Sequence, residues 1–298
     1  MKKVQILLST YNGSQYVEEQ INSILNQDYP EISLLIRDDG SKDDTLQIIK
    51  RLAAEDCRIS YYQGDNLGVY KSFFDLMIKA DLSADYYALS DQDDLWKSDK
   101  IRKAVEMLGD NKEIPILYCS NTSLVDEDLK PLENKIKRPR IRPSFGNALV
   151  ENISAGCTCV FNKKLLEIVV EHLPDFTIMH DWWLYLTASA FGKTIYDENA
   201  YILYRQHSNN VVGSRFTYFD EFKVRVNNFN NNRGKINHQL REFKRLYVLD
   251  NEKAKLLNMV ILVKKITYRI RIIFNTQIYR QRKMDNFIFK ILYLTGKI

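Results

Sequence analysis

The chain has 298 residues, of which 45% are hydrophobic and 27% are charged. This composition excludes a disordered protein, and the length accommodates one large α/β domain with an appended module. The four cysteines form no C-x-x-C pair, and the apolar run after Met1 is too short for a signal peptide. We therefore expect reduced thiols in a cytoplasmic protein.

The net charge of +5 is distributed unevenly along the chain. Residues 215–298 hold 19 Lys and Arg against 6 Asp and Glu, a net charge of +13, whereas residues 1–214 carry a net charge of −8. A basic segment beside an acidic domain indicates an anionic partner, either membrane phospholipid or nucleic acid. Other features must separate these two partners.

Short apolar runs alternate with segments of helical period in the first part of the chain. The alternation predicts βαβ units with a mostly parallel sheet, whose ligands bind beyond the carboxyl ends of the strands. We expect strands over residues 5–9, 33–37, 59–63 and 86–90, and helices around residues 16–25, 46–53 and 73–78.

A polar motif follows each of these four expected strands. Thr10-Tyr11-Asn12 follows the first, Asp38-Asp39-Gly40-Ser41 the second, residues 66–71 the third and Asp91-Gln92-Asp93-Asp94 the fourth. Each motif alone is also what an ordinary turn contains. Because carboxyl ends of parallel strands meet at one edge, four such motifs together predict a binding cleft there.

The pattern is less regular after residue 116, and we interpret this part as the second half of the same domain. Strands are expected over residues 116–121, 152–160 and 200–205, and helices near 165–173 and 182–191. If residues 152–160 form a strand, Cys157 and Cys159 share one of its faces.

The basic C-terminal part contains no proline after Phe219 and has apolar residues at helical spacing. Lys264, Lys265, Arg269 and Arg271 interrupt every candidate membrane span. Aromatic, aliphatic and basic residues interleaved in this way are typical of helices that lie on a membrane surface. The alternative is that the apolar faces pack on the α/β domain and the charges are solvated.

Asp91 and Asp93 lie two positions apart at a strand end, so their carboxylates are expected on the same side. Such a pair suits Mg²⁺ or Mn²⁺, which takes oxygen ligands and bridges carboxylates to a diphosphate. The alternative is an acidic helix start before Trp96, with Asp94 or Ser98 as the cap.

The phrases STYNG, IRDDGSKDDT, DNLGVYKSF, SDQDDLW, MHDWW and LYRQHSNNVVG occur in this order. Together they resemble the family 2 glycosyltransferases, most closely the bacterial polysaccharide rhamnosyltransferases. The resemblance covers residues 1–214 and implies a GT-A fold, with a nucleotide-binding half over 1–105 and an acceptor half over 106–214. Residues 215–298 are expected to form a separate helical region.

The resemblance also implies roles for individual residues on the donor side. Thr10, Tyr11 and Asn12 would line the pocket for the base and ribose, and Asp39 would accept a hydrogen bond from the uracil or thymine ring. Lys71 would face the nucleotide.

The resemblance assigns a second set of residues to the diphosphate end of the donor. Asp91 would contact the ribose or metal side, Asp93 would ligate Mn²⁺ or Mg²⁺, and His207 would help to hold the metal. Arg205 would offset phosphate charge. The segment reads DQDD rather than a simple D-x-D, so Asp91, Asp93 and Asp94 compete as ligands, with Asp93 preferred and Asp94 a candidate cap for the next helix.

Asp181 matches the catalytic base of the family, which takes the proton from the acceptor hydroxyl in an inverting displacement. Trp182 and Trp183 would form a sugar platform or fill the core, and Asp181 as a simple helix cap is the alternative for this cluster.

The resemblance implies a nucleotide-sugar donor and a lipid-linked saccharide acceptor at the inner face of the cell membrane. dTDP-L-rhamnose is the expected donor, with UDP-hexoses and UDP-N-acetylhexosamines as alternatives. A noncatalytic nucleotide-binding or nucleic-acid-binding module is the competing interpretation. The chain lacks the dinucleotide and P-loop fingerprints, and we expect no nucleic-acid partner.

Overall fold

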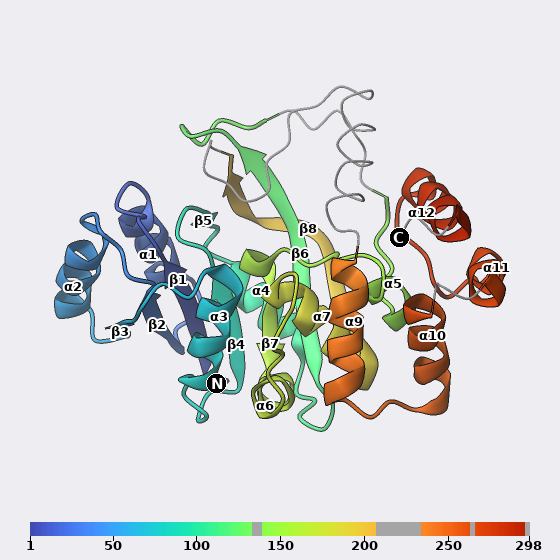
Figure 1. The fold of residues 1–298 in the computed structure, drawn as a ribbon. Helices are drawn as coiled ribbons and strands as arrows, with labels where there is room; N and C mark the ends of the chain where they lie inside the picture. The colour runs from blue at the N-terminus through green and yellow to red at the C-terminus, as the bar shows by residue number, and fades with distance from the viewer. Residues whose placement is uncertain (133–138, 207–233, 263–265, 296–298) are drawn as a thin grey trace.

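The computed structural model describes residues 1–132, 139–206, 234–262 and 266–295 (Figure 1). Its centre is an eight-stranded sheet in the order β3-β2-β1-β4-β7-β6-β8-β5. The strands are β1 (Val4–Thr10), β2 (Ile32–Asp38), β3 (Ile59–Gln63), β4 (Tyr86–Ser90), β5 (Leu95–Trp96), β6 (Ile116–Val125), β7 (Val160–Asn162) and β8 (Lys193–Arg205).

The first four strands form the parallel sheet that the sequence predicts. β1 pairs in parallel with β2 and with β4, and β2 pairs in parallel with β3. β1, β2 and β4 are mostly buried on both faces, which explains why they appear as continuous apolar runs rather than alternating patterns. The strand order reverses between β1 and β4, so the crevice beyond these two strands is where such a sheet binds ligands.

Helices cover both faces of the sheet, and all of the helices expected in the first two thirds of the chain are confirmed. α1, α2 and α4 share one buried cluster with alternate residues of β1 and β2, whereas α3, α6 and α7 lie in the cluster on the other face. The bounds are α1 (Val17–Leu25), α2 (Thr45–Glu55), α3 (Val69–Ile78), α4 (Lys100–Leu108), α5 (Phe145–Ala148), α6 (Lys163–Glu171) and α7 (His180–Phe191).

The second half of the sheet is mixed. The short strand β7 pairs antiparallel with both β4 and β6, and β5 pairs antiparallel with β8. β6 and β8 pair in parallel with two register irregularities, and β8 begins seven residues before the strand expected at residues 200–205. This extra length escaped prediction because residues 193–199 are largely polar.

The strand expected over residues 152–160 is wrong for most of its length. The chain forms a 3-10 turn at Gly156–Thr158 and becomes a strand only at Val160. Cys157 consequently packs in the core cluster on one face of the sheet and Cys159 in the cluster on the other, so the two thiols do not share a face. All four cysteines are free thiols.

The C-terminal part forms α9 (Lys235–Leu246), α10 (Asn251–Ile261), α11 (Ile266–Phe274) and α12 (Lys283–Thr295). One face of these helices joins the core of the α/β domain, because Phe243 and Tyr247 contact the Trp183 ring at centroid distances of 5.3 and 6.1 Å. The alternative that these helices pack on the catalytic domain therefore holds for that face. None of the helices in the described ranges is both long enough and apolar enough to cross a bilayer.

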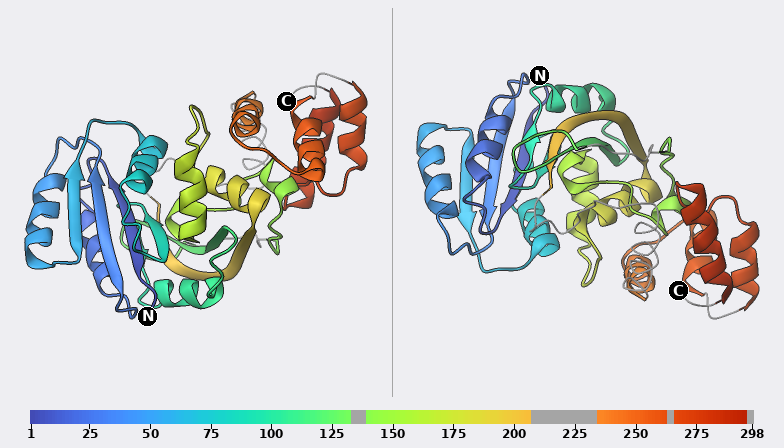
Figure 2. Two further views of the ribbon diagram at one scale, coloured as in Figure 1. Left: turned by 90° about the horizontal axis from the view of Figure 1, so that it is seen from below. Right: turned by 90° about the horizontal axis from the view of Figure 1, so that it is seen from above.

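The parallel half of the sheet and the C-terminal helices lie toward opposite ends of the molecule. Figure 2 shows α2 and β3 at one end and α11 and α12 at the opposite end, with α6, α7 and β8 between them.

Candidate functional site

The loops that follow β1, β2 and β4 lie at one edge of the sheet and are tied to one another. Gln92 binds the backbone of Tyr11 twice, since its side-chain oxygen accepts from Tyr11 N at 2.8 Å and its side-chain nitrogen donates to Tyr11 O at 3.1 Å. A Cβ at Gly13 would lie 2.2 Å from the Gln92 side-chain oxygen, so a larger residue there would displace the Gln92 amide. The expected rim of the sheet is thus one connected structure.

The β1 loop is also fixed to the loop after β2. Asn12 adopts a left-handed backbone with φ of 48°, and its side-chain oxygen accepts from Lys42 N at 2.8 Å. The Ser41 hydroxyl accepts from Asn12 N at 2.9 Å. Thr10 is buried and its hydroxyl donates to Arg37 O, whereas Tyr11 is 43% exposed. Of these three residues, Tyr11 and Asn12 are exposed.

Asp39 is only 3% exposed and its carboxylate is already engaged within the chain. It pairs with Arg37 and accepts from the backbone N–H groups of Leu67 and Gly68 at 2.9 and 3.0 Å. Asp39 thereby fixes the turn that leads into α3. Lys71, in the first turn of α3, is exposed.

The side chains of the acidic segment after β4 differ in how deeply they are buried. Asp91 and Asp93 are partly buried, whereas Asp94 is 1% exposed. One carboxylate oxygen each of Asp91 and Asp94 and the Cys157 sulfur lie within 4.8 Å of one another. The expectation that Asp94 caps the next helix is wrong, because β5 follows it and α4 begins only at Lys100, after Asp99.

The charges of this cluster are closely coupled to Asp181. Burial, with the nearby carboxylates of Asp93 and Asp181 as further causes, raises the pKa of Asp91 to about 7. Burial, with Asp91 and Asp93 as further causes, raises the pKa of Asp94 well above its usual range. The sheet edge and the start of α7 therefore gather four carboxylates on one side of the molecule.

These residues fit a divalent metal ion such as Mg²⁺ or Mn²⁺. Neither side-chain oxygen of Asp94 makes a hydrogen bond of standard geometry to the described residues, although the Cys157 thiol and the Arg205 backbone lie close enough to favour its charged form. Burial raises the pKa of Cys157 well above its usual range, so its thiol stays protonated. The ligands on offer are carboxylate oxygens, which a hard cation prefers.

Arg205, at the end of β8, is buried and binds the backbone of the acidic segment. Its Nε donates to the carbonyl oxygen of Asp93 at 3.1 Å, and its other nitrogens bind Glu19 and the carbonyl of Glu127. Its guanidinium also lies 4.6 Å from the centre of the Tyr16 ring. These contacts orient Asp93. His207 lies outside the described residues.

Asp181 occupies the first turn of α7, in a buried corner formed with residues 152–156. One side-chain oxygen accepts from Trp182 N at 2.6 Å, and the Asn152 side chain and the Gly156 N–H also favour the charged carboxylate. Burial is the larger effect and raises the pKa of Asp181 to about 6. A carboxylate with this pKa is ionised at neutral pH and is basic enough to accept a proton.

The residues beside Asp181 belong to the core rather than to a sugar platform. Trp182 and Trp183 are 7% and 0% exposed, and the Trp182 indole donates to Ala148 O at 2.8 Å. His180 stacks on Phe73 of α3 at 4.0 Å, and burial lowers its pKa to about 3, so it is neutral. The stack joins α3 to the helix that carries Asp181.

Several structural contributors to the site were missed from the sequence. The sequence predicts no role for Gln92 or Asn152, and Arg37 belongs to the motif IRDDGSKDDT without a role of its own. Gly156 was assigned to a strand. A glycine within an otherwise apolar run was the one available signal, because such a residue often marks a close backbone approach.

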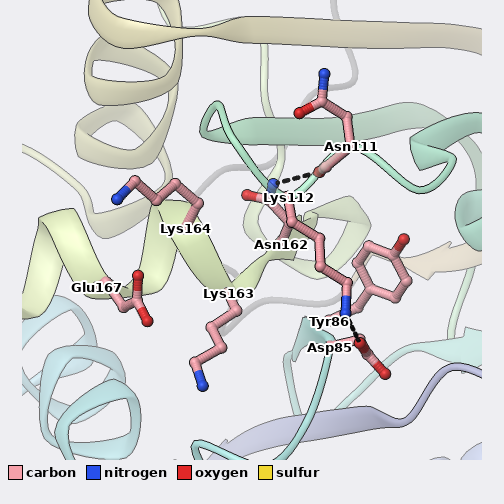
Figure 3. A pocket seen from close by; sticks show the side chains of 8 residues that line it. All are labelled: Asp85, Tyr86, Asn111, Lys112, Asn162, Lys163, Lys164 and Glu167. Atoms are coloured by element: carbon pink, nitrogen blue, oxygen red, sulfur yellow. Dashed lines mark hydrogen bonds and ion pairs between the residues drawn. The ribbon is translucent and has the colours of Figure 1, made fainter.

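A second depression lies at the opposite end of β4, with a volume of about 130 Å³. Figure 3 shows Lys112, Lys163 and Lys164 around it, and Lys112 pairs with Asp85 at 3.1 Å. Asp85 precedes β4, so this depression is at the amino edge of the sheet, away from Asp91 and Asp181.

Comparisons with known proteins agree with this geometry. Residues 5–169 match Glycosyl transferase family 2. The dTDP-rhamnosyl transferase RfbG of Shigella flexneri is 31% identical over 232 residues, which cover 72% of this chain and 77% of that protein. The putative teichuronic acid biosynthesis glycosyltransferase TuaG of Bacillus subtilis is 27% identical over 212 residues, which cover 71% and 81% of the two chains.

Solved structures show the same fold. S. aureus TarS 1–349 superimposes with a TM-score of 0.59 at 16% identity, covering 89% of this chain and 72% of that one. The mannosyltransferase PcManGT from Pyrobaculum calidifontis, in complex with GDP-Man and Mn²⁺, gives a TM-score of 0.57 at 16% identity, covering 86% and 68%. The predicted GT-A fold is confirmed.

Proposed function

Because the chain belongs to glycosyl transferase family 2, we propose that it transfers L-rhamnose from dTDP-L-rhamnose to a saccharide acceptor during synthesis of a cell-surface polysaccharide. The 31% identity to a dTDP-rhamnosyl transferase supports the donor, and the similarity to a putative teichuronic acid glycosyltransferase supports the polysaccharide context. The observation that carries the chemistry is the electrostatic contact of Asp181 with Asp91. It supports the assignment of Asp181 as the base and of the neighbouring carboxylates as the group that faces a metal-bound diphosphate.

The proposed reaction is a single displacement with inversion. The Asp181 carboxylate removes the proton from the acceptor hydroxyl, and that oxygen forms a bond to the anomeric carbon of the donor. The bond from this carbon to the diphosphate oxygen breaks, and its electron pair leaves with the nucleoside diphosphate. The buried setting of Asp181 keeps its pKa near 6 and so matches the base to neutral pH.

The acidic segment acts on the leaving group in this proposal. Asp93, with Asp91 beside it, would hold Mn²⁺ or Mg²⁺, which neutralises the charge that develops on the departing diphosphate. Arg205 keeps Asp93 in place through its carbonyl oxygen, and Gln92 fixes the segment to the β1 loop. Thr10, Tyr11, Asn12, Asp39 and Lys71 form or support the base and ribose side of the cleft.

A donor panel tests this function. Thermal unfolding of the chain is measured with Mn²⁺ and one nucleotide sugar at a time: dTDP-L-rhamnose, UDP-glucose, UDP-galactose and UDP-N-acetylglucosamine. A ligand at a hundredfold excess over its Kd stabilises the folded state by about 2.7 kcal/mol, which raises the melting temperature. We expect the largest shift with dTDP-L-rhamnose. A larger shift with a UDP-sugar would show that the proposed donor is wrong and leave the assignment as a glycosyltransferase unchanged. No shift with any of the four nucleotide sugars would refute the proposal.

A further inference from the structure

α11 and α12 pack against each other and are fixed to the acceptor half of the domain by the segment between them. Tyr279 O accepts from the Asn147 side chain at 2.9 Å, and Gln281 N donates to Glu151 at 2.7 Å. Lys290 of α12 donates to the carbonyl of Ile273 at the end of α11 at 2.9 Å. The helix pair is therefore held in one orientation on the domain.

Each of the two helices buries one face and leaves the opposite face apolar and exposed. In α11 the buried residue is Ile272, and in α12 the inner positions are Asp285, Phe289 and Tyr293. The outer positions recur every three or four residues, so they form one stripe on each helix. We call these residues the outer ridge: Ile266 (57% exposed), Ile270 (47%), Phe274 (81%), Met284 (58%), Phe287 (61%), Ile291 (43%) and Leu294 (43%).

The charge around the outer ridge is strongly positive. Residues 266–295 contain six Lys and Arg, of which Arg280 pairs with Glu151 of the domain, and a single acidic residue, Asp285, which is on the buried face. At 100° per residue, Arg269 and Arg271 lie on either side of the α11 stripe, and Lys283 borders the stripe of α12. Long basic side chains beside an apolar stripe can reach anionic headgroups while the stripe enters the lipid.

We propose that the outer ridge docks the enzyme on an anionic phospholipid bilayer. A second copy of the chain fits this surface less well, because a twofold interface would place the same basic patch against itself. An acidic bilayer instead complements the charge and accepts the seven apolar side chains together. This inference rests on the proposed function, since a lipid-linked acceptor must be met at a membrane surface.

The position of the ridge agrees with acceptor delivery. Asn147 and Glu151 bind the 279–281 segment, and Asn152 and Gly156, a few residues later, contact Asp181. One stretch of chain thus connects the base of the ridge to the catalytic corner. The nucleotide-binding end, with α2 and β3, is at the other end of the molecule (Figure 2). Docking through the ridge leaves that end free for a soluble donor.

Vesicle flotation of the full chain tests the docking surface, with vesicles of phosphatidylglycerol and phosphatidylcholine compared with phosphatidylcholine alone. We expect binding to the anionic vesicles that weakens with added salt. The triple variant Ile270→Gln, Phe274→Gln, Phe287→Gln should bind at least about tenfold more weakly. Arg271→Gln should weaken binding about fivefold. The matched control, Ile78→Gln with Leu82→Gln, alters side chains that are 50% and 59% exposed in the nucleotide-binding half and should bind normally.

Two further measurements separate the outcomes. Release of dTDP from dTDP-L-rhamnose in solution with Mn²⁺ should be unchanged in the triple variant, and its melting temperature should equal that of the wild type. If the wild type bound vesicles but turned over no donor, the proposed function would be refuted and the docking proposal would stand. Equal binding by the triple variant and the wild type would overturn the proposal. The proposal would also be overturned if the wild type bound no vesicles and instead formed a concentration-dependent dimer in analytical ultracentrifugation that the triple variant did not form.

Discussion

The carboxylate of Asp181 at the start of α7 lies close enough to Asp91 at the end of β4 for its charge to raise the pKa of Asp91. The two residues are 90 positions apart in the sequence and come from opposite halves of the domain. Asp93 acts on Asp91 in the same direction. The proposed base and the proposed metal-binding segment therefore lie close together, as the displacement mechanism requires.

The pH dependence of transfer should report Asp181. Its pKa is raised from 3.8 to about 6 by burial, so the carboxylate is charged above pH 6 and becomes protonated as the pH falls. A protonated Asp181 cannot take the acceptor proton. We expect kcat at saturating donor to fall about tenfold per pH unit below about pH 6. A rate that stays constant down to about pH 4.5 in folded enzyme would exclude Asp181 as the base.

Substitutions at Asp181 and Asp93 should separate transfer from donor binding. Asp181→Asn keeps the shape of the corner but cannot accept a proton, so transfer should fall by about 10²–10⁴-fold with donor affinity unchanged. Asp93→Asn should weaken metal-dependent donor binding. Calorimetric titration of donor with Mn²⁺, beside a transfer assay, gives both quantities for each variant. The reverse pattern would contradict both roles.

Gln92→Ala should loosen the connection between the β1 loop and the β4 loop. The variant loses two hydrogen bonds to the Tyr11 backbone, each worth about 1 kcal/mol, so donor affinity should fall roughly 5- to 30-fold. The measurement is donor Kd by calorimetry, with Gln47→Ala on the exposed side of α2 as the control. Unchanged affinity would show that the two loops hold their places without Gln92.

The sequence predicted the parallel part of the fold because its signals are local. The strands over residues 33–37 and 86–90 are apolar runs of strand length, and the helix over 16–25 shows a clear 3.6-residue period. Because these strands are parallel, their carboxyl ends lie at one edge of the sheet, and Asp39 and Asp91 follow two of those ends. The aspartates around the cleft were found for this reason and through motif resemblance.

What the sequence missed depends on contacts between distant segments. The turn at Gly156–Thr158 forms because residues 152–156 must wrap around Asp181, and nothing within the apolar run of residues 157–161 indicates it. Asp94 is buried beside Cys157, 63 positions away, rather than at a helix start. The resemblance implies that Arg205 offsets phosphate charge, and its pair with Glu19 on α1 could not be read from the sequence.

Arg37 should be essential for stability rather than for chemistry. It is 2% exposed and binds Asp39, Asp75 at 2.8 Å and the carbonyl of Asp65 at 2.9 Å. Arg37→Met leaves the Asp39 carboxylate buried without its partner, which should lower the free energy of unfolding by about 3–5 kcal/mol. Arg51→Met removes an exposed pair with Glu18 and should change it by less than about 1 kcal/mol. Urea unfolding of both variants compares the two, and equal stabilities would refute a structural role for Arg37.

Gly156→Ala should impair Asp181 without touching the donor. A Cβ at position 156 would lie 2.8 Å from Nε2 of His180, and the His180 ring is buried against Phe73 and has little room to move. The backbone N–H of Gly156, which favours the charged form of Asp181, should then be displaced. We expect a lower kcat, an unchanged donor KM and an acid limb of the pH profile that moves above about pH 6. The double variant Gly156→Ala with His180→Ala removes the obstructing ring and should restore the position of the acid limb, because effects at contacting residues are not additive. A limb that stays at the wild-type pH in Gly156→Ala would show that this N–H does not tune the base.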